Sequence, residues 1–63
     1  MNKIETKLKQ MLDTLIATQT DYNKFESGNK SAGTRLRKSM QEIKTLAQEV
    51  RVEVQHQKNS VLV

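Results

Sequence analysis

The chain has 63 residues, no cysteine, no proline and one histidine, and its formal net charge is +4. This length allows one domain at most, and the lack of cysteine excludes disulfides and a thiolate metal site. No stretch has the roughly 18 apolar residues that a membrane span needs, and the N-terminus lacks the apolar run of a signal peptide. We therefore expect a cytoplasmic protein whose basic charge favours polyanionic partners.

The first half of the chain has the apolar periodicity of one long helix. Its apolar residues recur at alternating steps of four and three, which is typical of one helix face with a seven-residue repeat. The set is Ile4, Leu8, Met11, Leu15, Thr18, Tyr22 and Phe25, with Thr18 as its one polar member. The pattern predicts a helix over about residues 2–27.

A short glycine-containing segment, "ESGNKSAG", predicts a tight turn at about residues 28–29. Gly28 suits the left-handed residue that follows a helix end. Asn29 suits the N-cap of the next helix, and Ser31 is the alternative cap. A turn this short predicts that the helices fold back into an antiparallel hairpin.

The second half of the chain repeats the pattern of the first. The periodic set here is Gly33, Leu36, Met40, Ile43, Ala47, Val50 and Val54. It predicts a helix over about residues 30–57, and we expect a frayed tail over 58–63 because "NSVLV" has no helical support. The predicted fold is all-α, with residues 1–63 as a single helical-hairpin domain.

A single hairpin of this length buries too little surface to be stable alone, and oligomerisation is the remaining remedy. We therefore predict a homodimer in which two hairpins form a four-helix bundle. The aromatic residues Tyr22 and Phe25 are assigned to the core rather than to base stacking, because both lie on the apolar stripe. The predicted core and dimer residues are Leu8, Leu15, Tyr22, Phe25, Leu36, Met40, Ile43 and Val50.

The segment "SGNKSAGTRLRKS", residues 27–39, contains cations and no acid. The cations are Lys30, Arg35, Arg37 and Lys38. A helix N-terminus disfavours cations by about 0.3–1 kcal/mol each, so this arrangement predicts a bound anion that offsets the repulsion. Backbone N–H groups after Gly28 and Asn29 are expected to help hold a phosphate oxygen. The alternative is an ordinary solvated turn.

Two further rows have seven-residue spacing in the second half. Lys30, Arg37, Lys44, Arg51 and Lys58 form a cationic row about 42 Å long, able to track a nucleic-acid backbone. The alternative, which the pattern favours, is that these side chains cover the margin of a buried seam. The row Arg35, Glu42, Glu49 and His56 is expected on the outer face.

We expect no enzymatic activity, because no catalytic set, metal-ligand spacing or phosphate loop is recognisable. A two-helix chain has little room for a pocket of the usual size, so we expect no cofactor and no small-molecule substrate.

Residues 28–51, "GNKSAGTRLRKSMQEIKTLAQEVR", resemble the bacterial linker-histone-like family, the short relatives of the chlamydial histone-like nucleoid protein. The residues that carry the resemblance are Gly28, Asn29, Lys30, Ser31, Ala32, Gly33, Thr34, Arg35, Arg37 and Arg51. The resemblance implies DNA binding and nucleoid compaction. Chlamydial members also have a Lys/Ala/Pro-rich tail thought to bind DNA, and these 63 residues include none. We therefore expect either that the turn binds DNA or that this is mainly the oligomerising half.

The function expected is that of a sequence-nonspecific, double-stranded-DNA-binding, histone-like protein of the nucleoid. A dimer with two basic turns is able to bend, bridge or compact DNA. The alternative is a helical interaction module whose basic turn binds an acidic protein, RNA or anionic lipid. The predicted DNA-binding residues are Asn29, Lys30, Thr34, Arg35, Arg37 and Lys38, with Lys44 and Arg51 as additional candidates.

Overall fold

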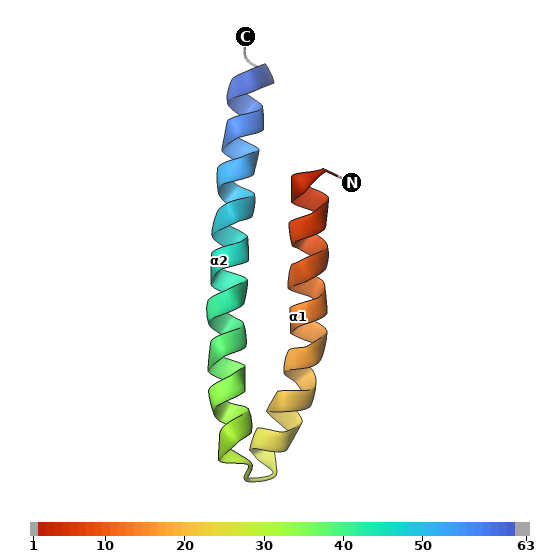
Figure 1. Ribbon diagram of the computed structural model, residues 1–63, viewed down its shortest axis with the longest axis vertical. Helices are drawn as coiled ribbons and strands as arrows, with labels where there is room; N and C mark the ends of the chain where they lie inside the picture. The colour runs from red at the N-terminus through yellow and green to blue at the C-terminus, as the bar shows by residue number, and fades with distance from the viewer. Residues whose placement is uncertain (1, 62–63) are drawn as a thin grey trace.

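Two long helices joined by a short turn form the protein, as Figure 1 shows. The computed structural model describes residues 2–61, in which α1 spans Lys3–Glu26 and α2 spans Lys30–Val61. The helices run antiparallel side by side, and the molecule is 55 Å long. The predicted all-helical hairpin is confirmed. The C-terminal part of α2 extends past the start of α1.

The turn is built by hydrogen bonds from two consecutive residues, Gly28 and Asn29. Gly28 has a φ of 99°, a left-handed conformation that glycine adopts without strain. Its N–H donates to the carbonyl of Phe25 at 2.9 Å, and the N–H of Asn29 donates to the carbonyl of Lys24 at 3.0 Å. These two bonds are those of a Schellman motif and satisfy the last carbonyls of α1. The predicted role of Gly28 is confirmed.

Asparagine side chains cap the first turn of both helices. Asn29 Oδ1 accepts from the N–H of Ala32 at 3.2 Å, and Asn2 Oδ1 accepts from the N–H of Glu5 at 2.8 Å. Asn29, rather than Ser31, is therefore the cap of α2.

A narrow seam joins the helices, and only part of each predicted apolar stripe enters it. Ala32 is fully buried and Thr18 is 8% exposed, with the Thr18 hydroxyl donating to the carbonyl of Thr14 at 2.7 Å. That bond satisfies a polar group that is otherwise costly to bury. The other seam residues are half-buried: Ile4, Met11, Leu36, Ser39, Ile43, Leu46, Ala47 and Val50.

The rest of the two stripes forms an exposed apolar side of the hairpin. We use this name for Leu8, Leu15, Tyr22, Met40 and Val54, which are 41–50% exposed. Leu15, Tyr22 and Met40 line one open groove of about 510 Å³ between the helices. Each residue turns a helix by about 100°, so positions 8, 15 and 22 lie roughly 40° beyond 4, 11 and 18. One neighbouring helix is too narrow to cover both rows.

The opposite side of the hairpin carries ion pairs and corrects one expectation. Lys7 Nζ lies 3.0 Å from Glu49 Oε1, and Arg35 Nε lies 3.0 Å from Asp21 Oδ1. The row that contains Arg35, Glu42, Glu49 and His56 was expected on the outer face, and this was wrong. Two of its members reach across to α1, so the row lies at the edge of the seam. We call this the ion-pair side.

The second helix is longer than expected. It continues to Val61, so the expectation of a frayed tail was wrong for residues 58–61, and residues 62–63 lie outside the described part. No glycine or proline stops the helix there. The amides of Gln57 and Gln55 also bond one turn away, to Glu53 at 3.4 Å and to Asn59 at 3.3 Å. The first helix departs from its predicted bounds by one residue at each end.

Candidate nucleic-acid interface

The positive charge of the protein belongs to one helix. α1 contains four lysines and four carboxylates, so its formal charge is zero. In α2, seven cations stand against three carboxylates, which accounts for the net charge of +4. An anionic partner is therefore attracted to α2 and to the turn that precedes it.

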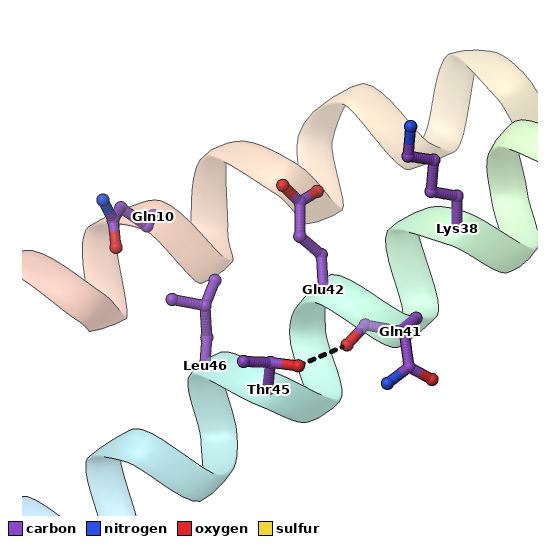
Figure 2. A pocket seen from close by; sticks show the side chains of 6 residues that line it. All are labelled: Gln10, Lys38, Gln41, Glu42, Thr45 and Leu46. Carbon is purple, nitrogen blue, oxygen red and sulfur yellow. Dashed lines mark hydrogen bonds between the residues drawn. The ribbon is translucent and has the colours of Figure 1, made fainter.

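The acids of α2 lie on one side of the helix together with Arg35 and Lys38, whereas the other five cations lie on a different side. Glu42 and Glu49 are on the ion-pair side by their seven-residue spacing, and Glu53, one turn after Glu49, is at its margin. A groove of about 470 Å³ lies on that side, and in Figure 2 it runs from Gln10 of α1 and Leu46 of α2 at one end, past Glu42, to Lys38 at the other. Thr45 on the wall of this groove donates to the backbone carbonyl of Gln41 at 3.1 Å.

The turn presents most of the predicted DNA-binding residues to solvent. Lys30, Thr34, Arg37 and Lys38 are exposed, and none has a side-chain hydrogen bond or ion pair within residues 2–61. Asn29 is exposed too, but its side-chain oxygen is engaged as the α2 cap. Asn29, Lys30 and Thr34 lie in the turn and the first helical turn of α2, and Arg37 and Lys38 follow in the next turns.

Arg35 differs from the other cations of the turn, because its guanidinium is bound to Asp21. The Arg35 side chain is 48% exposed and the Asp21 side chain is 18% exposed. Sequence reasoning missed Asp21, which lies outside the acid-free segment. The sequence could have predicted this pair. Asp21 and Arg35 are each seven residues from Gly28, so they lie opposite each other in a hairpin that turns at Gly28. Lys7 and Glu49 obey the same rule.

The backbone amides of the turn are largely committed to the fold. The N–H groups of Gly28 and Asn29 donate to α1 carbonyls, and that of Ala32 donates to the Asn29 side chain. Fewer backbone N–H groups of the turn are therefore left for an anion, namely those of Lys30 and Ser31 within the described residues.

The cationic row continues along α2 from the turn. Lys44 and Arg51, the two additional candidates, are exposed like Lys30, Arg37 and Lys58. None of the five has an ion pair in the described part of the chain. The structure thus leaves two candidate surfaces, the turn and the row, and they share Lys30 and Arg37.

Features of other functional classes are not found in residues 2–61. These residues contain no group of three or more histidine, cysteine or carboxylate side chains that could hold a metal ion. Neither described helix is long and apolar enough to cross a membrane.

Comparison with known families gives one match, which extends beyond the resemblance seen at the turn. Residues 4–60 match the model of the histone H1-like protein Hc1 family, so the match includes α1, which carries no recognisable motif of its own. No curated protein and no solved structure matches the chain significantly. Histone H1-like proteins are structural, DNA-binding proteins of the nucleoid and not enzymes. Since the match covers nearly the whole sequence, the chain belongs to the histone H1-like Hc1 family.

Proposed function

We propose that this protein binds duplex DNA without sequence specificity, through contacts between its cations and the phosphates. The observation that carries the proposal is the exposure of Lys30, Arg37 and Lys38 beside a turn, without carboxylate partners, in a member of a histone-like family. Guanidinium groups bind phosphate through forked hydrogen bonds and ammonium groups bind it as point charges, and each neutralised phosphate releases condensed counterions.

Each predicted residue of the turn has a donor to offer. The Thr34 hydroxyl and the side-chain NH₂ of Asn29 are able to donate to phosphate oxygens. Arg35 uses its Nε on Asp21, which leaves the N–H groups of its terminal nitrogens. Contacts of this kind position a protein on the duplex but carry no sequence information. Binding should therefore be similar on unrelated sequences.

The exposed apolar side supports the second part of the proposal, a homodimer. Two copies that bury Leu15, Tyr22 and Met40 against each other would form a four-helix bundle and gain the core that one hairpin lacks. A dimer carries two basic turns, and two separate contacts with DNA allow bending, bridging or compaction in the nucleoid.

A mobility-shift titration tests the function. The protein is titrated against two short DNA duplexes of unrelated sequence, a duplex RNA and anionic phospholipid vesicles, each at several salt concentrations. We expect equal affinity for the two DNA duplexes and a linear fall of the logarithm of the binding constant with the logarithm of the salt concentration. Absence of DNA binding at low salt would overturn the proposal. Binding to RNA or vesicles alone would instead favour the helical interaction module.

A further inference from the structure

We propose that DNA lies along one side of α2, over most of its length, and not only at the turn. This inference rests on the proposed function and specifies the surface that performs it. The surface, here called the basic side, combines two adjacent seven-residue rows. Its members are Lys30, Arg37, Lys44, Arg51 and Lys58 in one row and Thr34, Gln41, Gln48 and Gln55 in the next.

The absence of acids around the cationic row is the first argument. On a helix surface, a carboxylate three or four residues from a cation stabilises the helix. The neighbours of Lys44 at that spacing are a methionine, an alanine and two glutamines, and the neighbours of Arg37 and Arg51 are equally free of acids. Both ion pairs between side chains of the described residues lie on the ion-pair side instead. The cations of the basic side therefore repel one another with no internal compensation.

The glutamine row is the second argument. Gln41, Gln48 and Gln55 are exposed and follow Thr34 at steps of seven, so a line of amide and hydroxyl donors runs beside the line of cations. Of these, Gln41 also borders the groove on the ion-pair side. Amide and hydroxyl side chains commonly supply contacts to the phosphates and sugars of DNA. Hydration alone does not require this row to hold glutamines, because carboxylates would hydrate the surface equally well. Carboxylates would repel phosphates, whereas the amides of Gln41, Gln48 and Gln55 are able to donate to them.

The geometry of α2 is the third argument. Seven residues rise about 10.5 Å, so the five cations span roughly 42 Å. This exceeds one turn of B-DNA, about 34–36 Å, and a straight helix laid against the duplex would meet its backbones more than once. The C-terminal end of the cationic row lies beyond α1. Lys7 pairs with Glu49, so in this antiparallel register Asn2, five residues before Lys7, is opposite position 54. Lys58 therefore lies past the end of the shorter helix.

The alternative role, in which these cations cover the margin of the seam, fits the structure less well. Between most seam residues of α2 and the cationic row lies the row that contains Gly33, Met40, Ala47 and Val54, of which Ala47 itself borders the seam. Met40 and Val54 remain 42% and 41% exposed, so the cations do not cover even the row next to them.

Site-specific crosslinking locates the DNA directly, since the chain has no cysteine of its own. Gln48→Cys places a thiol on the basic side, and Gln10→Cys places one on the ion-pair side; both positions are exposed glutamines. Each variant is coupled to the same thiol-reactive photocrosslinker and irradiated with a labelled duplex. We expect at least a several-fold higher yield from position 48. Equal yields, or a higher yield from position 10, would overturn the inference.

A charge variant supplies the second test. Lys44→Gln, Arg51→Gln and Lys58→Gln remove three cations from the basic side while leaving the turn intact. The matched control removes three cations from α1, with Lys3→Gln, Lys9→Gln and Lys24→Gln. If the inference holds, the first variant lowers the slope of the logarithm of the binding constant against the logarithm of the salt concentration by up to about 2.7, or about 0.9 for each lost phosphate contact. The control variant changes this slope much less. Equal losses would overturn it.

The outcomes also separate this inference from the proposed function. A parent protein that fails to bind DNA would overturn both. A parent that binds DNA, with a triple α2 variant that binds equally well, would overturn the basic side alone and leave the turn as the binding surface. Circular dichroism confirms that each variant is helical before it is compared.

Discussion

Arg35 Nε donates a hydrogen bond to Asp21 Oδ1 across the two helices, at 3.0 Å. This contact ties one cation of the turn to the hairpin itself, while Lys30, Arg37 and Lys38 stay exposed. Arg35 and Arg37, two residues apart in sequence, thus face different surroundings on α2. The pair also fixes the register of the hairpin together with Lys7 and Glu49, since each pair is placed symmetrically about Gly28.

Asp21→Asn should strengthen DNA binding. The change weakens the hold on the Arg35 guanidinium, because an amide oxygen accepts its hydrogen bond without a charge, and it removes one negative charge near the turn. We expect a higher affinity and an increase of up to about 0.9 in the log–log salt slope for each Arg35 that gains a phosphate contact. The free energy of unfolding should fall by less than about 1 kcal/mol, the usual scale for partly exposed pairs. Fluorescence anisotropy and chemical denaturation provide the two measurements.

Asp13→Asn is the matched control for this substitution. Asp13 is exposed and has no bond to a cation in the described residues, but its replacement changes the net charge equally. If both variants bind DNA equally well, the gain comes from overall charge, and the release of Arg35 contributes nothing.

The local structure of the turn could be predicted from sequence because it depends on neighbouring residues. Gly28 and Asn29 are each the residue type that their position requires, and the seven-residue repeats set two helices. The Asp21–Arg35 contact could not be read in the same way, because it joins residues 14 apart whose meeting depends on the hairpin register. Once Gly28 is taken as the centre of the turn, however, the pair follows by counting.

Asn29→Ala should destabilise the protein by about 0.5–2 kcal/mol, the usual range for removal of an N-cap. The Ala32 N–H would lose its side-chain acceptor at 3.2 Å. Asn23→Ala serves as the comparison, because it replaces an exposed asparagine inside α1 where alanine is the better helix former. Urea denaturation at one protein concentration should show a loss for the first change only. Equal midpoints for the two variants would show that the cap contributes little.

Gly33→Ala tests the packing of the Phe25 ring against the backbone of α2. An added Cβ at Gly33 would lie 2.8 Å from two ring carbons of Phe25, so the ring must move. We expect the substitution to be neutral or destabilising in the natural chain. In a Phe25→Ala background it should instead stabilise by about 0.5–1 kcal/mol, the usual advantage of alanine over glycine within a helix. An equal stabilisation in both backgrounds would show that the ring does not rest on Gly33.

The exposed apolar side predicts self-association. Sedimentation equilibrium should give a mass near twice 7.3 kDa. Leu15→Gln together with Met40→Gln should shift the protein toward monomers, because both side chains line the same groove. Val52→Gln is the control, since Val52 is 57% exposed but lies outside that groove. A stable, folded monomer of the natural chain at micromolar concentration would contradict the dimer.

The exposed apolar side also shows why the buried residues of one hairpin could not be identified from the sequence alone. The periodicity of Leu8, Leu15 and Tyr22 could not be separated from that of Ile4 and Met11, since both rows are apolar and adjacent. Within one hairpin, only the second row is covered. The sequence pattern predicts how much surface must be buried, but it does not state whether the neighbouring helix or a second copy buries it.

The most direct test of phosphate binding by the cations of α2 is the salt dependence of a turn variant. Lys30→Gln with Arg37→Gln changes two residues common to the turn and the basic side, and Lys3→Gln with Lys9→Gln removes the same charge from α1. Anisotropy titrations at several salt concentrations should show the log–log slope falling by about 1.8 for each engaged hairpin in the first variant. The α1 variant should keep the slope of the natural chain. An unchanged slope in the first variant, or an equal fall in both variants, would contradict phosphate binding by the cations of α2.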